Sequence, residues 1–197
     1  KYPLSHLLPE YPRTRHIPHK PNAARDDLVA LAHEARPILE SEHVDVTEKV
    51  DAANSGMCLY EGQPVIRNRN HILRKGYSKD TPAKNQFKNI FNWFYQNKEK
   101  FEKINELAGP VSVYGEWMVA VHGLEYDLLP SFFLVFDLYD YEAENYVETQ
   151  IARQLLTEAG FTIVPQLFYG KLDNYEQLEV LANQPSQFTT QGHHREG

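Results

Sequence analysis

One lysine among acids is the clearest candidate for chemistry in this chain. Lys49 is preceded by a glutamate and followed by Asp51, at the end of a polar run. A β-hairpin is predicted just after it, over 57–69, and its second strand carries Arg67 and Arg69. A lysine near arginines can hold a phosphate and attack it once its amine has lost a proton. A solvated surface lysine is the alternative interpretation, because lysines are seldom buried.

Other elements must position these residues. Helical periodicity is typical of the stretches that begin at Arg25 and span 84–107, 146–159 and 174–181. Alternating or continuous apolar runs predict strands over 111–118, 131–140 and 162–168. Strands and helices are mixed without a regular βαβ alternation. The pattern therefore predicts an α+β fold with antiparallel sheets flanked by helices.

Composition limits the class of protein. A chain of 197 residues fits one domain, 1–197, and its net charge of −7 argues against a broadly cationic nucleic-acid binder. The single cysteine excludes an internal disulfide and fits a reducing compartment. No apolar run approaches the ~20 residues of a membrane span, and the first residues lack the apolar core of a signal peptide. We expect an intracellular, cytoplasmic protein without a membrane partner.

Five short motifs follow one another along the chain. They occupy 49–54, 67–70, 114–117, 133–137 and 195–197. No single one is specific, but the ordered set resembles the ATP-dependent RNA ligases, members of the covalent nucleotidyltransferase superfamily. Asn54 ends the first motif as in RNA ligases, where DNA ligases and mRNA capping enzymes usually carry arginine.

The resemblance implies a nucleotidyltransferase (ATP-grasp-like) domain that is incomplete at its C-terminus. It implies that Lys49 attacks ATP, that AMP becomes a covalent lysine adduct, and that Mg²⁺ or Mn²⁺ assists. AMP would then pass to the 5′-phosphate of an RNA end, and a 3′-hydroxyl would seal the strand, as in RNA repair. The partners implied are therefore RNA ends.

Residue roles also come from the resemblance. Lys49 and Arg69 would be catalytic, with Arg69 on the ribose or phosphates and Arg67 as the second choice. Glu116 would bind the ribose hydroxyls and Phe136 would stack on adenine. The remaining contacts implied are Asp51 orienting the lysine loop, Asn54 near the nucleotide, and Glu196 holding the metal.

Two departures keep alternatives open. Ala52 stands where the family has glycine, and its methyl group would crowd the loop or oppose a positive φ there. The sequence also ends within the fourth motif, before the strand on which the family carries two more lysines. A catalytically inactive nucleotide- or RNA-binding module is one alternative, and a DNA ligase or capping-type transferase is the other.

Overall fold

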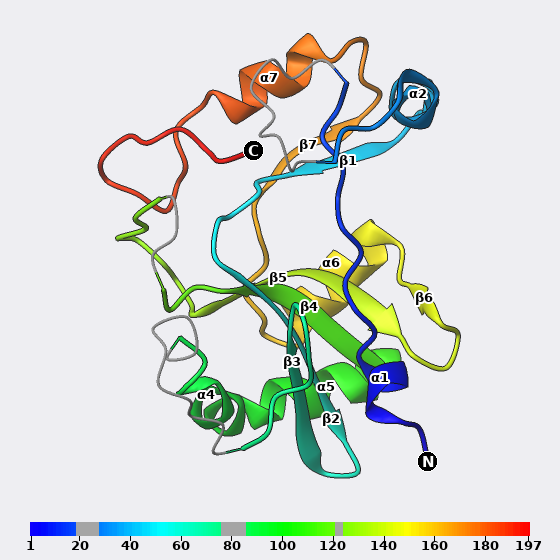
Figure 1. The fold of residues 1–197 in the computed structure, drawn as a ribbon, viewed down its shortest axis with the longest axis vertical. Coiled ribbons are helices and arrows are strands. Elements are labelled where there is room, and N and C mark those ends of the chain that lie inside the picture. Colours follow the sequence, from blue (N-terminus) through cyan, green and yellow to red (C-terminus); the bar gives the residue numbers. More distant parts are fainter. Residues whose placement is uncertain (19–27, 76–85, 121–123) are drawn as a thin grey trace. The chain divides into compact units, whose positions relative to one another are not determined.

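The computed structural model divides the chain into two compact units, each with its own antiparallel sheet (Figure 1). Residues 1–11 and 51–164 form the first unit, and residues 12–50 and 165–197 form the second. A single domain over 1–197 stays a prediction. The structure describes residues 1–18, 28–75, 86–120 and 124–197. The starts predicted for two helices, Arg25 and Lys84, lie outside those ranges.

Within the described residues, the sheet of the first unit has five strands in the order β3-β2-β4-β5-β6. These strands are β2 (Ala53–Tyr60), β3 (Gln63–Asn68), β4 (Val111–Trp117), β5 (Phe133–Asp140) and β6 (Asn145–Tyr146). Every pair of neighbouring strands is antiparallel. With the helices that flank it, this sheet confirms the predicted α+β class.

The predicted hairpin is confirmed, although β2 begins earlier than its apolar run. Glu61 and Gly62 form the turn with φ values of 49° and 75°. Two successive positive φ values match the twist of a tight hairpin. The start of β2 was not predicted because Asn54 and Ser55 are polar. Their pairing with β4 makes them part of the strand.

Helices α4 (Ile90–Gln96), α5 (Lys98–Ala108) and α6 (Thr149–Glu158) pack on one face of this sheet. The single helix predicted over 84–107 is divided at Asn97, whose φ and ψ are −113° and 16°. The Asn97 side-chain amide donates to the carbonyl of Trp93 at 2.8 Å, a local bond of the kind that competes with helix continuation. Gly109, at φ 81°, ends α5, a conformation that glycine adopts easily.

The aromatic stripe of α4 and α5 is part of the core, as its helical spacing indicated. The rings of Phe94 and Phe101 stack across the break with centroids 4.0 Å apart. Both side chains are buried among residues of the sheet. Burial of this aromatic surface holds the helices to the sheet.

The helix predicted over 146–159 is shorter at its start. Tyr146 pairs with Tyr139 in the sheet, and the Glu148 carboxylate accepts the first N–H groups of α6. The apolar spacing of the predicted helix places Ile151 on its inward face, and this is wrong because 53% of Ile151 is exposed. The buried positions of the helix are Ala152 and Leu156, so the apolar face is rotated by one residue.

The opposite face of the sheet is covered by the N-terminal segment, 1–11, which includes the short helix α1 (Leu4–Leu7). The Ser112 hydroxyl donates to the carbonyl of Leu7, and the Tyr114 hydroxyl donates to the carbonyl of Pro9, both at 2.6 Å. Apart from α1, the segment is irregular and follows the sheet surface, as its proline content indicated.

The second unit is built on two antiparallel strands, β1 (Val44–Thr47) and β7 (Gln166–Gly170), with helices α2 (Ala32–Glu40) and α7 (Glu176–Ala182). The strand predicted over 162–168 is displaced to β7. Residues 28–31 are not helical, and Pro37 lies inside α2 without ending it. The Asn174 side chain accepts the N–H of Gln177, in the first turn of α7, at 3.2 Å.

Buried thiol and phenol groups predict a loss of stability at high pH. Burial raises the pKa of Cys58 to about 12, against an ordinary value of about 8.5, and a hydrogen bond with Ser112 opposes this only in part. Burial also raises the pKa of Tyr141 and Tyr146 to about 12. The folded chain keeps these protons while the unfolded chain releases them, so stability present below pH 8.5 is lost as the pH rises toward 12.

We therefore expect the free energy of unfolding in urea to fall steadily between about pH 8.5 and pH 11. In Cys58→Ala the fall should start nearer pH 10, where only tyrosines contribute. A free energy of unfolding that is flat or rising across this range would contradict the prediction.

Candidate active site

The residues predicted to bind the nucleotide divide between the two units. Lys49 and Glu196 belong to the second unit. The first unit carries the others, which are Asp51, Asn54, Arg67, Arg69, Glu116 and Phe136. Within each unit, the structure brings several of these side chains together.

Lys49 lies two residues after the end of β1. Its amine is exposed, and the residue contacts the last residues of the chain, Glu196 and Gly197. Burial alternates over residues 48–50: Glu48 and Val50 are buried, and Lys49 between them is exposed. The Lys49 backbone N–H donates to the carbonyl of Gly197 at 2.9 Å, and its amine forms an ion pair with the Glu196 carboxylate. The Lys49 side chain is 55% exposed. A ligand can therefore reach an amine whose direction one carboxylate sets.

A buried ion pair lies next to this exposed one. Glu48 is 2% exposed, and its carboxylate accepts hydrogen bonds from the Ser186 hydroxyl and, at 3.3 Å, from Arg195 Nε. Arg195 also donates to the carbonyl of Leu181 at 2.6 Å, at the C-terminal end of α7. Each charge therefore has hydrogen-bond partners inside the unit.

Asn54 and Glu116 face each other in the sheet of the first unit. They are direct partners between β2 and β4, so their side chains project from the same face. Both are partly exposed. An amide and a carboxylate side by side offer the donors and acceptors that sugar hydroxyls require. This geometry fits the ribose contact predicted for Glu116.

Phe136 occupies a bulge in β5. Tyr114 pairs with Asp137 and Gly115 pairs with Val135, so Phe136 is left between the two pairs. A bulge redirects side chains, and Phe136 and Asp137 both contact Tyr11. The ring centroids of Tyr11 and Phe136 are 5.1 Å apart, and the Tyr11 hydroxyl donates to the Asp137 carboxylate. Burial, with the Asp137 carboxylate, raises the pKa of Tyr11. Tyr11 therefore stays a hydrogen-bond donor and holds the bulge in place.

Arg67 is enclosed by backbone groups. It is 7% exposed, and its guanidinium donates to the carbonyls of Leu8, Asn68 and Arg69 at 2.6, 3.0 and 3.2 Å. These bonds attach the N-terminal segment to the end of β3. The geometry favours a positioning role for Arg67 over direct contact with a phosphate.

Arg69 is exposed at a tight turn beyond β3. The Asn68 side chain closes this turn by accepting the N–H groups of Asn70 and His71 at 3.0 and 2.9 Å. Arg69 therefore presents a guanidinium to solvent from an ordered backbone. Of the two arginines, it is the better placed to meet a phosphate.

Ala52 fits its position without backbone strain. Among the described residues other than glycine, a positive φ occurs at Glu61 and Glu144 alone. Ala52 therefore adopts a φ open to any residue, and the concern about a positive φ does not apply. The N–H of the adjacent Asp51 donates to the Tyr126 hydroxyl at 2.9 Å, which orders the loop.

Replacing Ala52 with glycine should lower the free energy of unfolding by about 0.4–1 kcal/mol, because glycine gives the unfolded chain more conformational freedom. Urea denaturation measures this change. The matched variant is Glu61→Gly, at φ 49°, where relief of strain should offset that loss or exceed it. A gain of stability in Ala52→Gly would show that the methyl group is strained after all.

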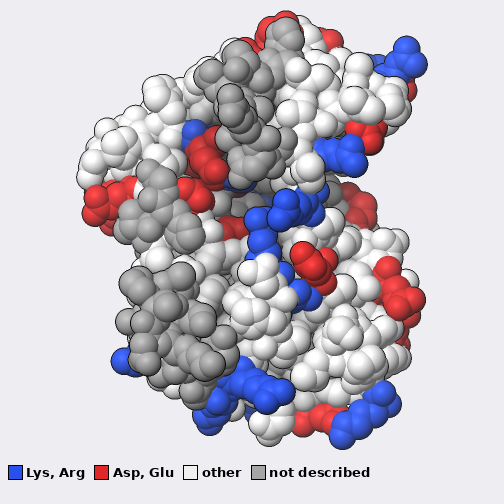
Figure 2. Space-filling view, viewed as in Figure 1, with Lys and Arg blue, Asp and Glu red and all other residues white. Residues whose placement is uncertain are grey.

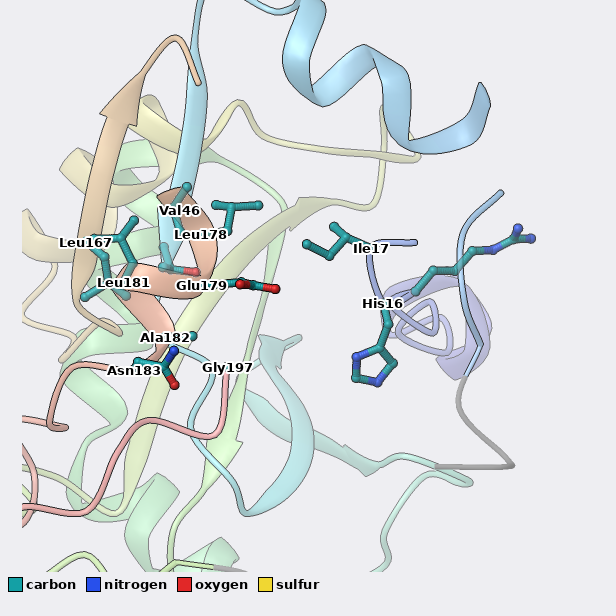
Figure 3. Close-up of a pocket in the computed structure, with 12 residues that line it drawn as sticks. His16, Ile17, Val46, Leu167, Leu178, Glu179, Leu181, Ala182, Asn183 and Gly197 are labelled. Carbon is teal, nitrogen blue, oxygen red and sulfur yellow. The ribbon is translucent and has the colours of Figure 1, made fainter. Parts of the chain in front are cut away.

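A separate cavity of 460 Å³ lies within the second unit (Figure 3). Figure 3 shows His16 and Ile17 on one side of it and the side chains of α7 on the other. Half of the residues that line it are aliphatic, and among the described residues none of the predicted nucleotide contacts lines it. The cavity meets the lysine site through Gly197, whose carbonyl binds the Lys49 N–H.

Acidic and basic side chains are interspersed on the face shown in Figure 2, in several separate groups. Because the net charge is −7, an anionic ligand would have to be bound by local basic groups such as Arg69. None of the helices in the described part of the chain combines the length and hydropathy that a bilayer crossing requires.

Solved structures of an RNA ligase from Naegleria gruberi share this fold. The enzyme with PPi is 22% identical with a TM-score of 0.60, and the chain covers 82% of its own length and 47% of the ligase. A lysine mutant with ATP and Mn gives 22% identity, a TM-score of 0.63 and coverage of 83% and 48%. An arginine mutant with ATP and Mn gives 26% identity and a TM-score of 0.60, and the match covers 82% of this chain and 47% of the ligase.

The fold is thus that of nucleotidyltransferase-type RNA ligase structures. The model of the RNA ligase family matches residues 42–197, and the chain belongs to that family. It spans about half the length of the solved ligases that it matches. A search of curated proteins found no match.

Three candidate positioning residues were not predicted from the sequence. Tyr11 lies far from Phe136 in the chain, and nothing in its local sequence indicates the contact. Glu48 and Arg195 each adjoin a predicted site residue, and that adjacency was the available signal. Their burial against each other depends on tertiary packing.

Proposed function

We propose that this chain is the adenylyltransferase part of an ATP-dependent RNA ligase. The neutral amine of Lys49 attacks the α-phosphorus of ATP, a phosphoramidate bond forms, and pyrophosphate leaves. AMP then passes from Lys49 to the 5′-phosphate of an RNA end. A 3′-hydroxyl attacks that activated phosphate, the strand is sealed, and AMP is released.

The observation that carries this proposal is the pairing of Lys49 with Glu196 within the span that matches the RNA ligase family. An accessible amine beside one carboxylate suits a nucleophile that must first be oriented and then lose its proton. The Naegleria gruberi ligase structures that contain PPi, or ATP and Mn, support a nucleotide as the ligand class.

The first unit supplies the nucleotide contacts in this proposal. Phe136 stacks on adenine, while Glu116 and Asn54 bind the ribose hydroxyls from neighbouring strands. Arg69 meets the phosphates, a task for a guanidinium with fixed donors. Asp51, which adjoins the lysine segment, orients the loop.

Glu196 fits a role in binding a divalent cation. One carboxylate oxygen pairs with Lys49, while the other, Oε2, is buried without a hydrogen-bond partner in the structure. The described residues contain no cluster of three or more metal-binding side chains. Mg²⁺ usually takes one or two carboxylates, with phosphate and water oxygens completing its shell. When bound, Mg²⁺ or Mn²⁺ would neutralise phosphate charge during the transfer.

The test is incubation of the chain with α-labelled ATP and Mg²⁺, followed by denaturing electrophoresis. Label that survives denaturation, needs the metal and is absent with γ-labelled ATP supports the lysine–AMP adduct. A chain that binds ATP without covalent label would instead be a binding module. Chase of the labelled chain with 5′-phosphorylated RNA or DNA then separates an RNA ligase from a DNA ligase.

A further inference from the structure

Two segments of the second unit, one at Glu48 and one at Arg195, contact each other at two consecutive positions. Glu48 meets Arg195, and the next residue in each segment makes the second pair, Lys49 with Glu196. A backbone hydrogen bond from Lys49 to Gly197 follows at 2.9 Å. The nucleophile proposed above therefore lies where two segments contact each other in a defined register.

The first pair is hidden from solvent while the second is open to it. The Glu48 side chain is fully buried and that of Arg195 is 11% exposed, whereas Lys49 and Glu196 are 55% and 32% exposed. Burying two charges costs solvation energy that their attraction need not return. A buried ion pair is therefore a weak source of stability, and its best-attested use is to fix register.

Arg195 is attached at more than one point, which suits such a use. Its guanidinium bonds Glu48 and the Leu181 carbonyl, and its backbone N–H donates to the carbonyl of Gln184 at 3.2 Å. On the other side, Glu48 is fixed by the Ser186 hydroxyl and by its own N–H, which donates to Pro165 at 3.0 Å. Neither partner can slide without losing several hydrogen bonds.

Register decides which groups meet on the exposed side. Exposure differs between neighbours in both segments: Glu48 is buried while Lys49 is exposed, and the Arg195 side chain is less exposed than that of Glu196. A slip of one residue would place Lys49 beside Arg195 or beside Gly197. The amine would then meet a cation or lose its carboxylate.

We infer that Glu48 and Arg195 are positioning residues that set this register, so that the Lys49 amine and the Glu196 carboxylate meet. The role in catalysis rests on the proposed self-adenylylation by Lys49. The contact itself can be measured without any activity.

A zero-length carbodiimide reagent joins a lysine amine to a carboxylate that touches it, and mass spectrometry quantifies the product. The full chain should give a Lys49–Glu196 crosslink and, as an internal reference, a Lys171–Glu42 crosslink from an exposed pair in the same unit. In Arg195→Met the first should fall and the second should persist. Arg195→Lys should restore part of the first, because it returns the charge without the guanidinium geometry.

Kinetics provide the second readout. In single-turnover labelling with α-labelled ATP, Arg195→Met should lower the maximal rate by about 100-fold, since small displacements of a nucleophile are costly. The ATP concentration at half-maximal rate should change by less than about threefold, because the groups proposed to hold the nucleotide are untouched. Glu42→Gln, which breaks the exposed reference pair, should leave both quantities unchanged.

The outcomes separate the two proposals. A folded Arg195→Met chain with an unchanged Lys49–Glu196 crosslink and unchanged labelling overturns the inference. If the unaltered chain never labels but the crosslink depends on Arg195, the adenylylation proposal fails and the register role stands. Should Arg195→Met unfold and lose both crosslinks, Glu48→Gln decides, because it removes the charge at nearly constant shape.

Discussion

Lys49→Ala is expected to abolish covalent labelling by α-labelled ATP, a loss on the order of 1,000-fold or more, because no other group can replace an attacking amine. Denaturing electrophoresis measures the retained label. Lys49→Arg should fail equally. It keeps a cation beside Glu196, but a guanidinium does not lose its proton at neutral pH.

The matched control is Lys171→Ala. Lys171 lies in the same unit, is 52% exposed, and pairs with Glu42 at 2.6 Å, so it resembles Lys49 in exposure and partner. Its loss should leave labelling intact. Both alanine variants should unfold in urea within about 1 kcal/mol of the unaltered chain, because exposed ion pairs contribute little. Label retained on folded Lys49→Ala would end the assignment of the nucleophile.

Gly115→Ala is expected to lower the free energy of unfolding by about 3 kcal/mol or more, at the upper end of overpacking effects. A Cβ at this position would lie 2.4 Å from the carbonyl oxygen of Leu134 and 2.9 Å from the ring of Phe133. The oxygen belongs to the backbone of β5, which is paired on both sides. Neither strand can move without breaking sheet hydrogen bonds.

Gly56→Ala is the comparison for that prediction. Its Cβ would meet side chains, Tyr114 at 2.8 Å and Leu8 at 3.0 Å, which can shift more readily than backbone. We expect a smaller loss, of about 1–2 kcal/mol, measured by urea denaturation. If Gly56→Ala costs as much as Gly115→Ala, the backbone contact is not the reason for glycine at 115. Labelling by Gly115→Ala should also fall, because Glu116 moves with its strand.

Much of the fold followed from local patterns. The hairpin, the strands β4 and β5, and the aromatic stripe of α4 and α5 were predicted from alternating, continuous or helically spaced apolar residues. The errors occurred where a local bond or a sheet partner outweighed the pattern. Asn97 divides a helix with its own side chain, and Tyr146 joins the sheet instead of α6. Both effects depend on neighbours that periodicity does not report.

The predicted site residues show the same division. The order of the motifs indicated the family, and the family match confirms it. Arg67 and Arg69 look equivalent in the sequence, yet one is enclosed by carbonyls and the other is exposed at a turn. The spacing of residues predicts which face of a strand each side chain is on. Whether that face is buried depends on which distant segment covers it.

The sequence by itself determined the α+β class, the ordered motifs and the lysine proposed as nucleophile, since these follow from residue type, period and order. Tertiary structure alone decided that Tyr11 supports the Phe136 bulge, that Gly115 is required by the backbone of β5, and that Glu48 and Arg195 are buried together. The reason is physical: these contacts join residues from different elements, so they depend on how the whole chain excludes water, and local propensity does not report them.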